Sequence, residues 1–209
     1  MATPRPLVRV KVCGMTNLED TLLAVQAGAD AVGFIFYDKS PRAVKQKIVK
    51  EIISALPPFV ETVGVFVNEE VEKVNKIAEI CGLHSVQLHG DESPAYCKKI
   101  HRHVIKAIRV KNEDSLKRLD KYSVTAFLLD TYSEDEQGGT GKTFDWNLVH
   151  RAKKSGPVIL AGGLKPINVR FAIERVRPYA VDVCSGVEKS PGVKNPEKVK
   201  AFIKAVKTY

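Results

Sequence analysis

The sequence predicts an α/β protein, a single-domain (β/α)8 TIM barrel that occupies residues 1–209. Short apolar runs rich in β-branched residues alternate with longer stretches whose apolar residues recur three and four positions apart. The alternation repeats along the whole chain, and 209 residues lie at the short end of the range for a closed eight-stranded barrel. A composition of 44% hydrophobic and 27% charged residues fits one globular domain with a sizeable core.

The apolar runs are the predicted strands. They begin near Val8, Ala31, Val63, Ser85, Val104, Thr125, Val158 and Ala180. Strands that alternate with helices imply a parallel sheet with right-handed crossovers. An open doubly wound sheet is the alternative, and for that fold we would expect a glycine-rich dinucleotide-binding fingerprint after the first strand. Cys13-Gly14-Met15-Thr16 supplies only one glycine, so the closed barrel is favoured.

Apolar stripes and helix-start signals place helices between these strands. The stripes consist of Ile48, Ile52, Ile53 and Leu56, of Val71, Val74, Ala78 and Cys81, and of Val199, Phe202, Ile203 and Val206. Starts are indicated by a capping box from Thr16 to Glu19 and by a cap residue before proline at Ser93-Pro94 and Asn195-Pro196. Each predicted stripe can cover one face of the sheet.

Composition argues for an unanchored protein of a reducing compartment. The N-terminal residues contain no apolar signal segment, and no apolar run approaches the roughly 20 residues that span a bilayer. The cysteines Cys13, Cys81, Cys97 and Cys184 stand far apart without a C-x-x-C pair, which predicts reduced thiols. We therefore expect a cytoplasmic protein without membrane contact.

The formal charge of +9 arises from 33 basic and 24 acidic residues that are interleaved along the chain. This pattern favours a solvated basic surface over a nucleic-acid site, and neither an aromatic RNA-binding signature nor a zinc finger is present in the sequence. The histidines have no carboxylate at convincing metal-ligand spacing. We expect no metal and no nucleic-acid partner.

In a closed barrel, the residues at the carboxyl ends of the strands converge on one mouth. Gly162-Gly163 follows the seventh predicted strand, and Ser185-Gly186 follows the eighth. Barrels often bind phosphate at these two loops through backbone N–H groups, and glycine lets the backbone approach an anion closely. Either pair alone could equally be a tight turn, but their occurrence in consecutive loops favours a phosphate site.

Two other strand ends offer an acid and a base. Cys13 ends the first strand, where it is either a small core residue or a thiolate that Lys11 or Arg42 stabilises. Asp130 ends a very apolar run, which favours a carboxyl with a raised pKa, although a loop-capping aspartate is as compatible with the segment. Together they resemble a base and acid pair across one mouth.

Two further segments bear on the mouth. Gln87 and His89 flank Leu88 at a strand end, where they either line the pocket or serve as structural polar groups. Residues 138–143 end in Gly-Lys-Thr as phosphate-binding P-loops do, but Glu136 stands where that motif requires glycine. The segment from Gly138 to Lys142 is instead predicted to be a mobile, glycine-hinged loop.

Seven motifs in order span nearly the whole chain. They are Lys11-Val12-Cys13-Gly14-Met15-Thr16, Ser40-Pro41-Arg42, Gly64-Val65-Phe66-Val67-Asn68, Val86-Gln87-Leu88-His89-Gly90, residues 138–146, Leu160-Ala161-Gly162-Gly163-Leu164 and Val181-Asp182-Val183-Cys184-Ser185-Gly186-Val187-Glu188. This ordered set resembles the phosphoribosylanthranilate isomerase family of tryptophan biosynthesis. One departure is visible, because Cys184 stands where the family usually has serine.

The resemblance implies an Amadori rearrangement of N-(5-phosphoribosyl)anthranilate without metal or cofactor. By motif, Cys13 is the expected general base and Asp130 the general acid. Arg42 is expected to hold the anthranilate carboxylate, while Gln87, His89 and Asp182 line or support the substrate site. The residues expected to bind the phosphate are Gly162, Gly163, Cys184, Ser185 and Gly186, with Cys184 contributing mainly its backbone N–H.

Rival functions remain open at this stage. The synthase that closes the indole ring should need a catalytic lysine and glutamate at strand ends, where this chain has Cys13 and Asp130. The isomerase of histidine biosynthesis usually has an aspartate pair, so Cys13 weighs against it. A noncatalytic anion or nucleic-acid binding protein would explain the charge but not the thiol and carboxyl pair. The sequence leaves a monomer and a homodimer equally possible.

Overall fold

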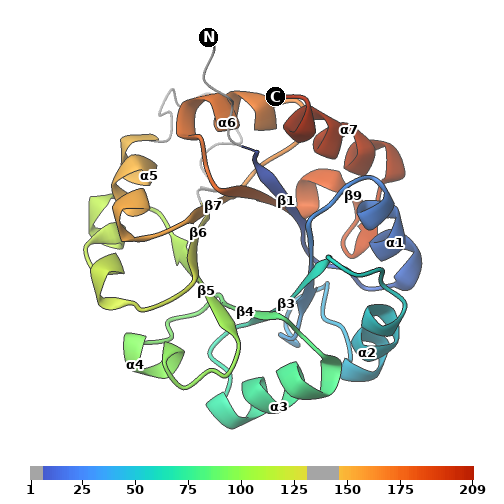
Figure 1. Cartoon of the computed structure of the whole chain (residues 1–209), viewed down its shortest axis with the longest axis horizontal. Helices are drawn as coiled ribbons and strands as arrows, with labels where there is room; N and C mark the ends of the chain where they lie inside the picture. Colours follow the sequence, from blue (N-terminus) through green and yellow to red (C-terminus); the bar gives the residue numbers. More distant parts are fainter. Residues whose placement is uncertain (1–6, 131–145) are drawn as a thin grey trace.

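The computed structural model describes residues 7–130 and 146–209, and its central feature is a closed barrel of parallel strands in sequence order (Figure 1). The strands are β1 (Arg9–Val12), β2 (Ala31–Ile35), β3 (Glu61–Phe66), β4 (Ser85–Leu88), β5 (His103–Arg109), β6 (Ala126–Asp130), β7 (Val158–Ala161) and β8 (Ala180–Val183). The ring closes through pairing of β1 with β8, from Arg9 opposite Ala180 to Val12 opposite Val183. The barrel prediction is confirmed, and the doubly wound alternative is wrong.

Helices surround the ring of strands (Figure 1). They are α1 (Leu18–Gln26), α2 (Gln46–Ser54), α3 (Val71–Cys81), α4 (Pro94–Cys97), α5 (Trp146–Ala152), α6 (Val169–Val176) and α7 (Pro196–Lys207), with a 3-10 turn η4 (Lys153–Ser155) after α5. The prediction of a helix in every unit is wrong between β5 and β6, where two 3-10 helices, η1 (Glu113–Leu116) and η2 (Leu119–Lys121), make the connection. Leu119 is the one residue that these two turns bury, too little for an amphipathic helix.

Side chains alternate between the inside and the outside of the barrel, as the pleat of a strand requires. The inner hydrophobic cluster is small, and among the described residues it consists of Val63, Ile105, Ala107, Ala126, Leu128, Ile159, Ala161 and Ala180. The outer cluster is larger and packs the strands against the helices, with Leu129 as one of its members. Since Leu128 faces the lumen, the same alternation directs Asp130 toward the mouth.

The predicted helix signals were partly right. Ser93 and Asn195 cap α4 and α7 by accepting hydrogen bonds from Tyr96 N and Lys198 N. All four residues of the last predicted stripe, at 199, 202, 203 and 206, are buried. On α3, three of the four predicted stripe residues are buried, and Ile77 joins them while residue 71 is only partly covered.

One helix prediction is wrong and another holds only in part. The capping box is absent, because Asn17 caps α1 by accepting from Asp20 N while the Thr16 hydroxyl donates to Gly192 O at 2.5 Å, a distant partner that local spacing does not reveal. On α2, Ile52 is buried and the other predicted stripe residues after it pack against the core, whereas Ile48 is 39% exposed and Val49 is buried instead.

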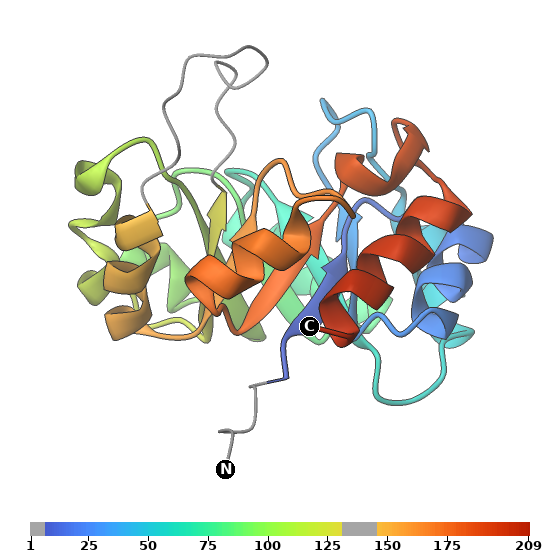
Figure 2. The ribbon, with the colours of Figure 1, turned by 90° about the horizontal axis from the view of Figure 1, so that it is seen from above.

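A short hairpin follows β8 at the C-terminal end of the barrel. The 3-10 turn η5 (Ser185–Val187) leads into β9 (Glu188–Ser190), which pairs antiparallel with β10 (Val193–Lys194). The hairpin stands at the same end as the segment that follows β2 (Figure 2), and a side chain at Gly192 would meet both Thr16 and Pro41. The hairpin thereby places Glu188 and Lys194 beside the end of β1.

A buried ion pair fixes the loop after β4. Lys106 Nζ lies 2.7 Å from Glu92 Oε2, and their side chains are 2% and 1% exposed. The ammonium also donates to the carbonyls of Leu88 and Gly90, and Glu92 accepts from the backbone N–H of Asn68 and Gly90. Each charge is paired and hydrogen-bonded, as burial requires, so the backbone on either side of His89 is held in place.

No helix within residues 7–130 and 146–209 combines the length and the apolarity that a membrane crossing requires.

Candidate active site

A pocket of about 310 Å³ lies at the carboxyl ends of the strands. It is lined by Cys13, Ile35, Val65, Gln87, His89, Asp130, Ala161, Gly162, Gly163, Leu164, Asp182, Val183, Cys184, Ser185 and Gly186. Every residue that the sequence predicted for the site is therefore on this wall except Arg42. The side chain of Arg42 lies just beside it, since its Cδ would be 2.9 Å from a Cβ added at Gly14.

Cys13 occupies the first position after β1, with its backbone N–H donating to Val183 O at 2.8 Å. Its thiol rests against β2, where a Cβ on Gly33 would lie only 2.7 Å from Sγ. A hydrogen bond from the Cys184 thiol holds the pKa of Cys13 well below its ordinary value, and the charges of Lys11 and Lys194 add to this effect against the cost of burial. Cys13 is therefore poised as a thiolate.

Lys11 and Asp182 form a buried ion pair beneath Cys13. Lys11 Nζ lies 2.9 Å from Asp182 Oδ1, and the two side chains are 3% and 9% exposed. Burial raises the pKa of Asp182 to about 6, with the Lys11 charge opposing that rise. Above this pH the carboxylate keeps the ammonium in place, and the ammonium in turn faces the sulfur of Cys13.

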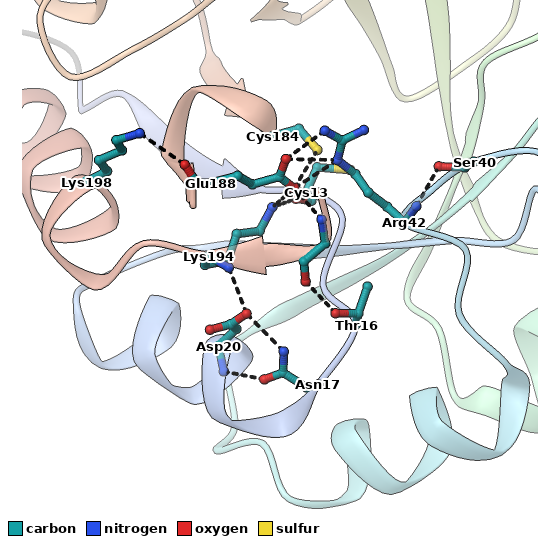
Figure 3. A network of polar contacts seen from close by, with 11 residues as sticks. Cys13, Thr16, Asn17, Asp20, Ser40, Arg42, Cys184, Glu188, Lys194 and Lys198 are labelled. Atoms are coloured by element: carbon teal, nitrogen blue, oxygen red, sulfur yellow. Dashed lines mark hydrogen bonds and ion pairs between the residues drawn. The ribbon is translucent and has the colours of Figure 1, made fainter. Parts of the chain in front are cut away.

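A second cluster of charges links the segment after β2, the hairpin and the segment after β1 (Figure 3). Arg42 donates to Glu188 through Nε at 2.8 Å and through Nη2 at 2.6 Å. Lys194, whose side chain is fully buried, donates to Glu188 at 3.0 Å and to Cys13 O at 2.6 Å. Burial alone raises the pKa of Glu188, but Arg42 and Lys194 outweigh it and lower the pKa to about 2.

The charges around the thiol are unequal in number. Three cations, Lys11, Arg42 and Lys194, face two carboxylates, Asp182 and Glu188. One positive charge therefore remains, and a thiolate at Cys13 balances it in a site that is screened from water. Together with the hydrogen bond from the Cys184 thiol, this imbalance outweighs burial and lowers the pKa of Cys13.

We predict that Cys13 reacts with iodoacetamide at a pH well below the ordinary pKa of a thiol. Alkylation follows the thiolate fraction, and the lowered pKa keeps Cys13 ionised as pH falls below its ordinary pKa of 9.0. The rate of alkylation of the tryptic peptide that contains Cys13, measured by mass spectrometry across pH, should therefore have a midpoint well below 9.0.

Cys97 is the internal control, because burial raises its pKa to about 11. Removing the thiol donor in Cys184→Ala should move the Cys13 midpoint upward, whereas Cys184→Ser should move it less because a hydroxyl also donates. A wild-type midpoint near the ordinary value would show that the surrounding charges do not activate Cys13.

On the opposite side of the pocket, Asp130 ends β6 and pairs with His89. His89 Nε2 lies 3.6 Å from Asp130 Oδ2, and the Asp130 side chain is 29% exposed. The other ring nitrogen of His89 lies 2.8 Å from Gln87 Nε2, which orients the ring. Gln87 is itself buried, and its Oε1 has no hydrogen-bond partner among the described residues.

The loops after β7 and β8 form the third side of the pocket. Gly162 and Gly163 have φ of 89° and 62°, a left-handed backbone that favours glycine. Gly186 packs so closely on the neighbouring loop that a Cβ would lie 1.9 Å from Leu164 O. Within the described chain, the backbone N–H groups of Gly162, Gly163, Ser185 and Gly186 donate to no protein acceptor. These loops can therefore accept an anion.

Sequence reasoning missed two residues of this site, Glu188 and Lys194. Glu188 was visible only as the last residue of a motif, and Lys194 carried no signal. Lys194 reaches Cys13 O from 181 positions away along the chain, and a lysine in a chain with 33 basic residues does not stand out. Arg42 was placed at the mouth as predicted, but it is already paired with Glu188.

Two further predictions concern this end of the barrel. The glycine-rich segment from Gly138 to Lys142 lies outside the described residues. In residues 7–130 and 146–209, no three His, Cys, Asp or Glu side chains converge in a way that could hold a metal ion.

Comparison with known proteins assigns the class and the family. The closed barrel, with its polar pocket at the carboxyl ends of the strands, defines the chain as a (β/α)8-barrel enzyme. The sequence model described as N-(5'phosphoribosyl)anthranilate isomerase matches residues 10–205. The chain belongs to this isomerase family.

Relatives and solved structures agree with this assignment. N-(5'-phosphoribosyl)anthranilate isomerase of Citrifermentans bemidjiense is 55% identical over 201 residues, 96% of this chain and 98% of the relative. The phosphoribosyl anthranilate isomerase of Thermotoga maritima superposes with a TM-score of 0.89 at 50% identity, over 97% of this chain and all of that one. A structure in complex with reduced 1-(o-carboxyphenylamino)-1-deoxyribulose 5-phosphate superposes with a TM-score of 0.87 at 48% identity, with the same coverage.

Proposed function

We propose that this pocket catalyses the Amadori rearrangement of N-(5'-phosphoribosyl)anthranilate to 1-(2-carboxyphenylamino)-1-deoxyribulose 5-phosphate, with Asp130 as general acid and Cys13 as general base. The observation that carries the proposal is the position of these two groups on one pocket wall. Membership of the isomerase family supports it. The reaction needs a proton donor and a proton acceptor within reach of one sugar.

The first step opens the sugar. Asp130 gives its proton to the furanose ring oxygen, the C1–O bond breaks, and the nitrogen lone pair forms a C1=N double bond. His89, 3.6 Å from Asp130 Oδ2 and held by Gln87, keeps the carboxyl in place for this transfer. The acid is thereby converted into a carboxylate, which the neighbouring imidazole can stabilise.

The second step moves the C2 proton. The Cys13 thiolate takes the proton from C2, the C2–H electrons form a C1=C2 double bond, and the iminium nitrogen recovers its lone pair. The resulting enolamine tautomerises to the ketone, so the reaction is an isomerisation with no net gain or loss of protons. Lys11 and Lys194 stabilise the thiolate before it reacts, and both steps are complete without a cofactor.

Two polar groups are available to hold the substrate, Arg42 for the anthranilate carboxylate and Gln87 for a hydroxyl or amine. Arg42 uses Nε and Nη2 on Glu188, while its Nη1 has no acceptor among the described residues. A guanidinium binds a carboxylate through such N–H groups. The unpaired Oε1 of buried Gln87 is suited to accept a hydrogen bond from a substrate hydroxyl or amine.

The phosphate is assigned to the backbone N–H groups of Gly162, Gly163, Ser185 and Gly186 together with Cys184. These groups have no acceptor in the described part of the chain, and they come from the two loops at which barrels often bind phosphate. Fixing the phosphate and the carboxylate at opposite ends orients the sugar between Cys13 and Asp130.

Because the cysteines of the described chain are unpaired, we assign the protein to the reducing cytoplasm.

The proposal is tested by turnover of phosphoribosylanthranilate, followed through the loss of its fluorescence. Activity that saturates with substrate and survives removal of metal by a chelator is the expected result. A folded protein that leaves this substrate unchanged would overturn the proposed reaction. The same protein should then be assayed with the aminoimidazole carboxamide substrate of histidine biosynthesis, on which no turnover is expected.

We also propose that the protein is a homodimer joined through the N-terminal ends of the barrel strands. Phe59 is fully exposed and has a φ of 68°, an unusual conformation for a bulky residue. It lies in the α2–β3 connection, which projects from that end of the barrel (Figure 2), next to a hollow of about 1610 Å³ that reaches Tyr179 and His101. The isomerase of Thermotoga maritima is described as dimeric, and a structure of monomers generated from it superposes with a TM-score of 0.86 at 47% identity.

Phe59→Asp is expected to yield a monomer, because a charge in the apolar contact would have to lose its water. Multi-angle light scattering on the wild type and the variant measures the change in mass. Ile167→Asp is the matched control, since residue 167 is 91% exposed but follows β7 at the opposite end. A monomeric wild type, or dimers of both variants, would contradict this interface.

A further inference from the structure

The structure brings a second cysteine into contact with Cys13. Cys13 and Cys184 directly follow Val12 and Val183, which are partners in the pairing of β1 with β8. The Cys184 thiol lies within hydrogen-bond reach of the Cys13 sulfur and also 3.9 Å from Glu188 Oε1, and Figure 3 shows the two sulfurs next to each other beside the Arg42 guanidinium. The mechanism above uses the thiolate of Cys13, whose pKa this contact lowers, and the backbone of Cys184. It needs no bond between the two sulfurs.

The pairing of β1 with β8 brings the two cysteines close to each other. Val12 and Val183 are partners, and adjacent strands lie about 4.7 to 4.9 Å apart. We infer that Cys13 and Cys184, one position further on, fall within the Cα separation of about 4.4 to 6.8 Å that disulfides span. The two side chains already point toward each other, as their sulfur contact requires. Bond formation therefore needs little movement of β1 or β8.

The site is accessible to a small oxidant. Both cysteines line the 310 Å³ pocket, and Cys184 is partly exposed. The two other cysteines are buried elsewhere, Cys81 on α3 and Cys97 on α4. Burial raises the pKa of both, which makes them poor targets for a peroxide.

We propose that Cys13 and Cys184 form a reversible disulfide when the protein meets hydrogen peroxide, and that this modification switches the isomerase off. The loss of activity rests on the proposed role of Cys13 as the base. The disulfide itself does not depend on that role. In the family that the sequence resembles, serine usually occupies the position of Cys184, and a serine cannot form this bond.

The chemistry balances in two steps. The Cys13 thiolate attacks one peroxide oxygen, the O–O bond breaks, and the departing hydroxide takes a proton to become water, which leaves a sulfenic acid. The Cys184 sulfur then attacks the Cys13 sulfur, the S–O bond breaks, and the Cys184 proton leaves with the hydroxyl as a second water. The two thiols give up two electrons, and one peroxide is reduced to two waters.

The charges around the pair favour this order of events. The pKa of Cys184 is raised first by its hydrogen bond to the Cys13 thiolate, and then by burial and by the charge of that thiolate. Once Cys13 is a neutral sulfenic acid, the repulsion from its charge is gone. Lys194 and Arg42 remain beside Cys184 and lower its pKa. The first oxidation thereby activates the second thiol.

The test uses the reduced full chain, treated with hydrogen peroxide and then alkylated with iodoacetamide. Tryptic peptides that contain Cys13 and Cys184 should appear joined in the mass spectrum, and dithiothreitol should separate them. Activity is measured on the same samples, each relative to its own untreated rate. The wild type should lose nearly all of its activity and regain it with dithiothreitol.

Two variants make the test specific. Cys184→Ser should give no crosslink, and its Cys13 should continue to the sulfinic acid, which dithiothreitol does not reduce, so its activity should stay lost. Cys97→Ser, which removes a thiol outside the pocket, should behave like the wild type. Oxidation of Cys13 in the wild type without a crosslink to Cys184 would overturn the proposal. If the untreated protein were inactive, the proposed function would fail while the crosslink could still be observed.

Discussion

Cys13→Ala is expected to lower kcat/KM for phosphoribosylanthranilate by about 10²- to 10⁴-fold, the usual cost of removing a general acid or base. Alanine leaves C2 of the sugar without a proton acceptor at the end of β1. The nearest other thiol, on Cys184, has a raised pKa and donates its proton rather than accepting one. Steady-state rates from the fluorescence assay, at several substrate concentrations, measure the loss.

The separate changes in kcat and in KM distinguish a loss of chemistry from a loss of substrate binding in this variant. A base that acts only in the transition state should change kcat and leave KM nearly constant. Cys81→Ala is the matched control, because it removes a buried thiol on α3 far from the pocket and should keep the wild-type rate. If Cys13→Ala retained full activity in a folded protein, the base would have to be a different group.

The barrel itself could be predicted because its determinants are local. Short apolar runs in the strands and apolar stripes on the helices are encoded within a few residues, and the predicted strand starts lie within two residues of the structure, for example Val63 against Glu61 for β3. The rule that strand ends meet at one mouth then placed Cys13, Asp130 and the glycine loops together without any knowledge of their contacts.

The electrostatic environment of Cys13 could not be predicted in the same way. The hairpin of β9 and β10 folds back over β1, and only this tertiary contact brings Lys194 to Cys13 and Glu188 to Arg42. The same limit applies to Thr16, whose hydroxyl donates to Gly192 rather than capping α1. In each case the partner lies more than 140 positions away, as for Arg42 and Glu188 at a separation of 146.

Cys184 shows how a departure from a motif acquires meaning from structure. In the sequence it is a serine-to-cysteine difference at a position that contributes its backbone N–H, which predicts a mild effect. In the structure its thiol faces Cys13 and lowers the pKa of that residue. The register of β1 and β8, which pairs positions 171 residues apart, creates this contact.

Asp130→Asn is expected to lower kcat by about 10²- to 10⁴-fold, as for other general acids. Asparagine keeps the shape of the side chain and can still face His89, but an amide cannot protonate the ring oxygen. Ring opening should then become rate-limiting, while substrate that has already opened remains competent for the C2 step at Cys13. The variant should also still alkylate at Cys13 with a midpoint well below 9.0, because the charges that lower that pKa belong to other residues.

Asp120→Asn is the matched control, since Asp120 is exposed in η2 and its substitution should leave the rate unchanged. Substrate analogues that differ in the basicity of the furanose ring oxygen, which leaves C1 when the ring opens, offer a sharper comparison than the rate with one substrate. If Asp130 protonates the ring oxygen, the wild-type rate should depend little on the basicity of that oxygen, whereas the Asp130→Asn rate should rise steeply with its ability to leave unprotonated. Equal sensitivity in both proteins would place the acid elsewhere, with His89 as the next group to replace because it lies 3.6 Å from Asp130 on the same pocket wall.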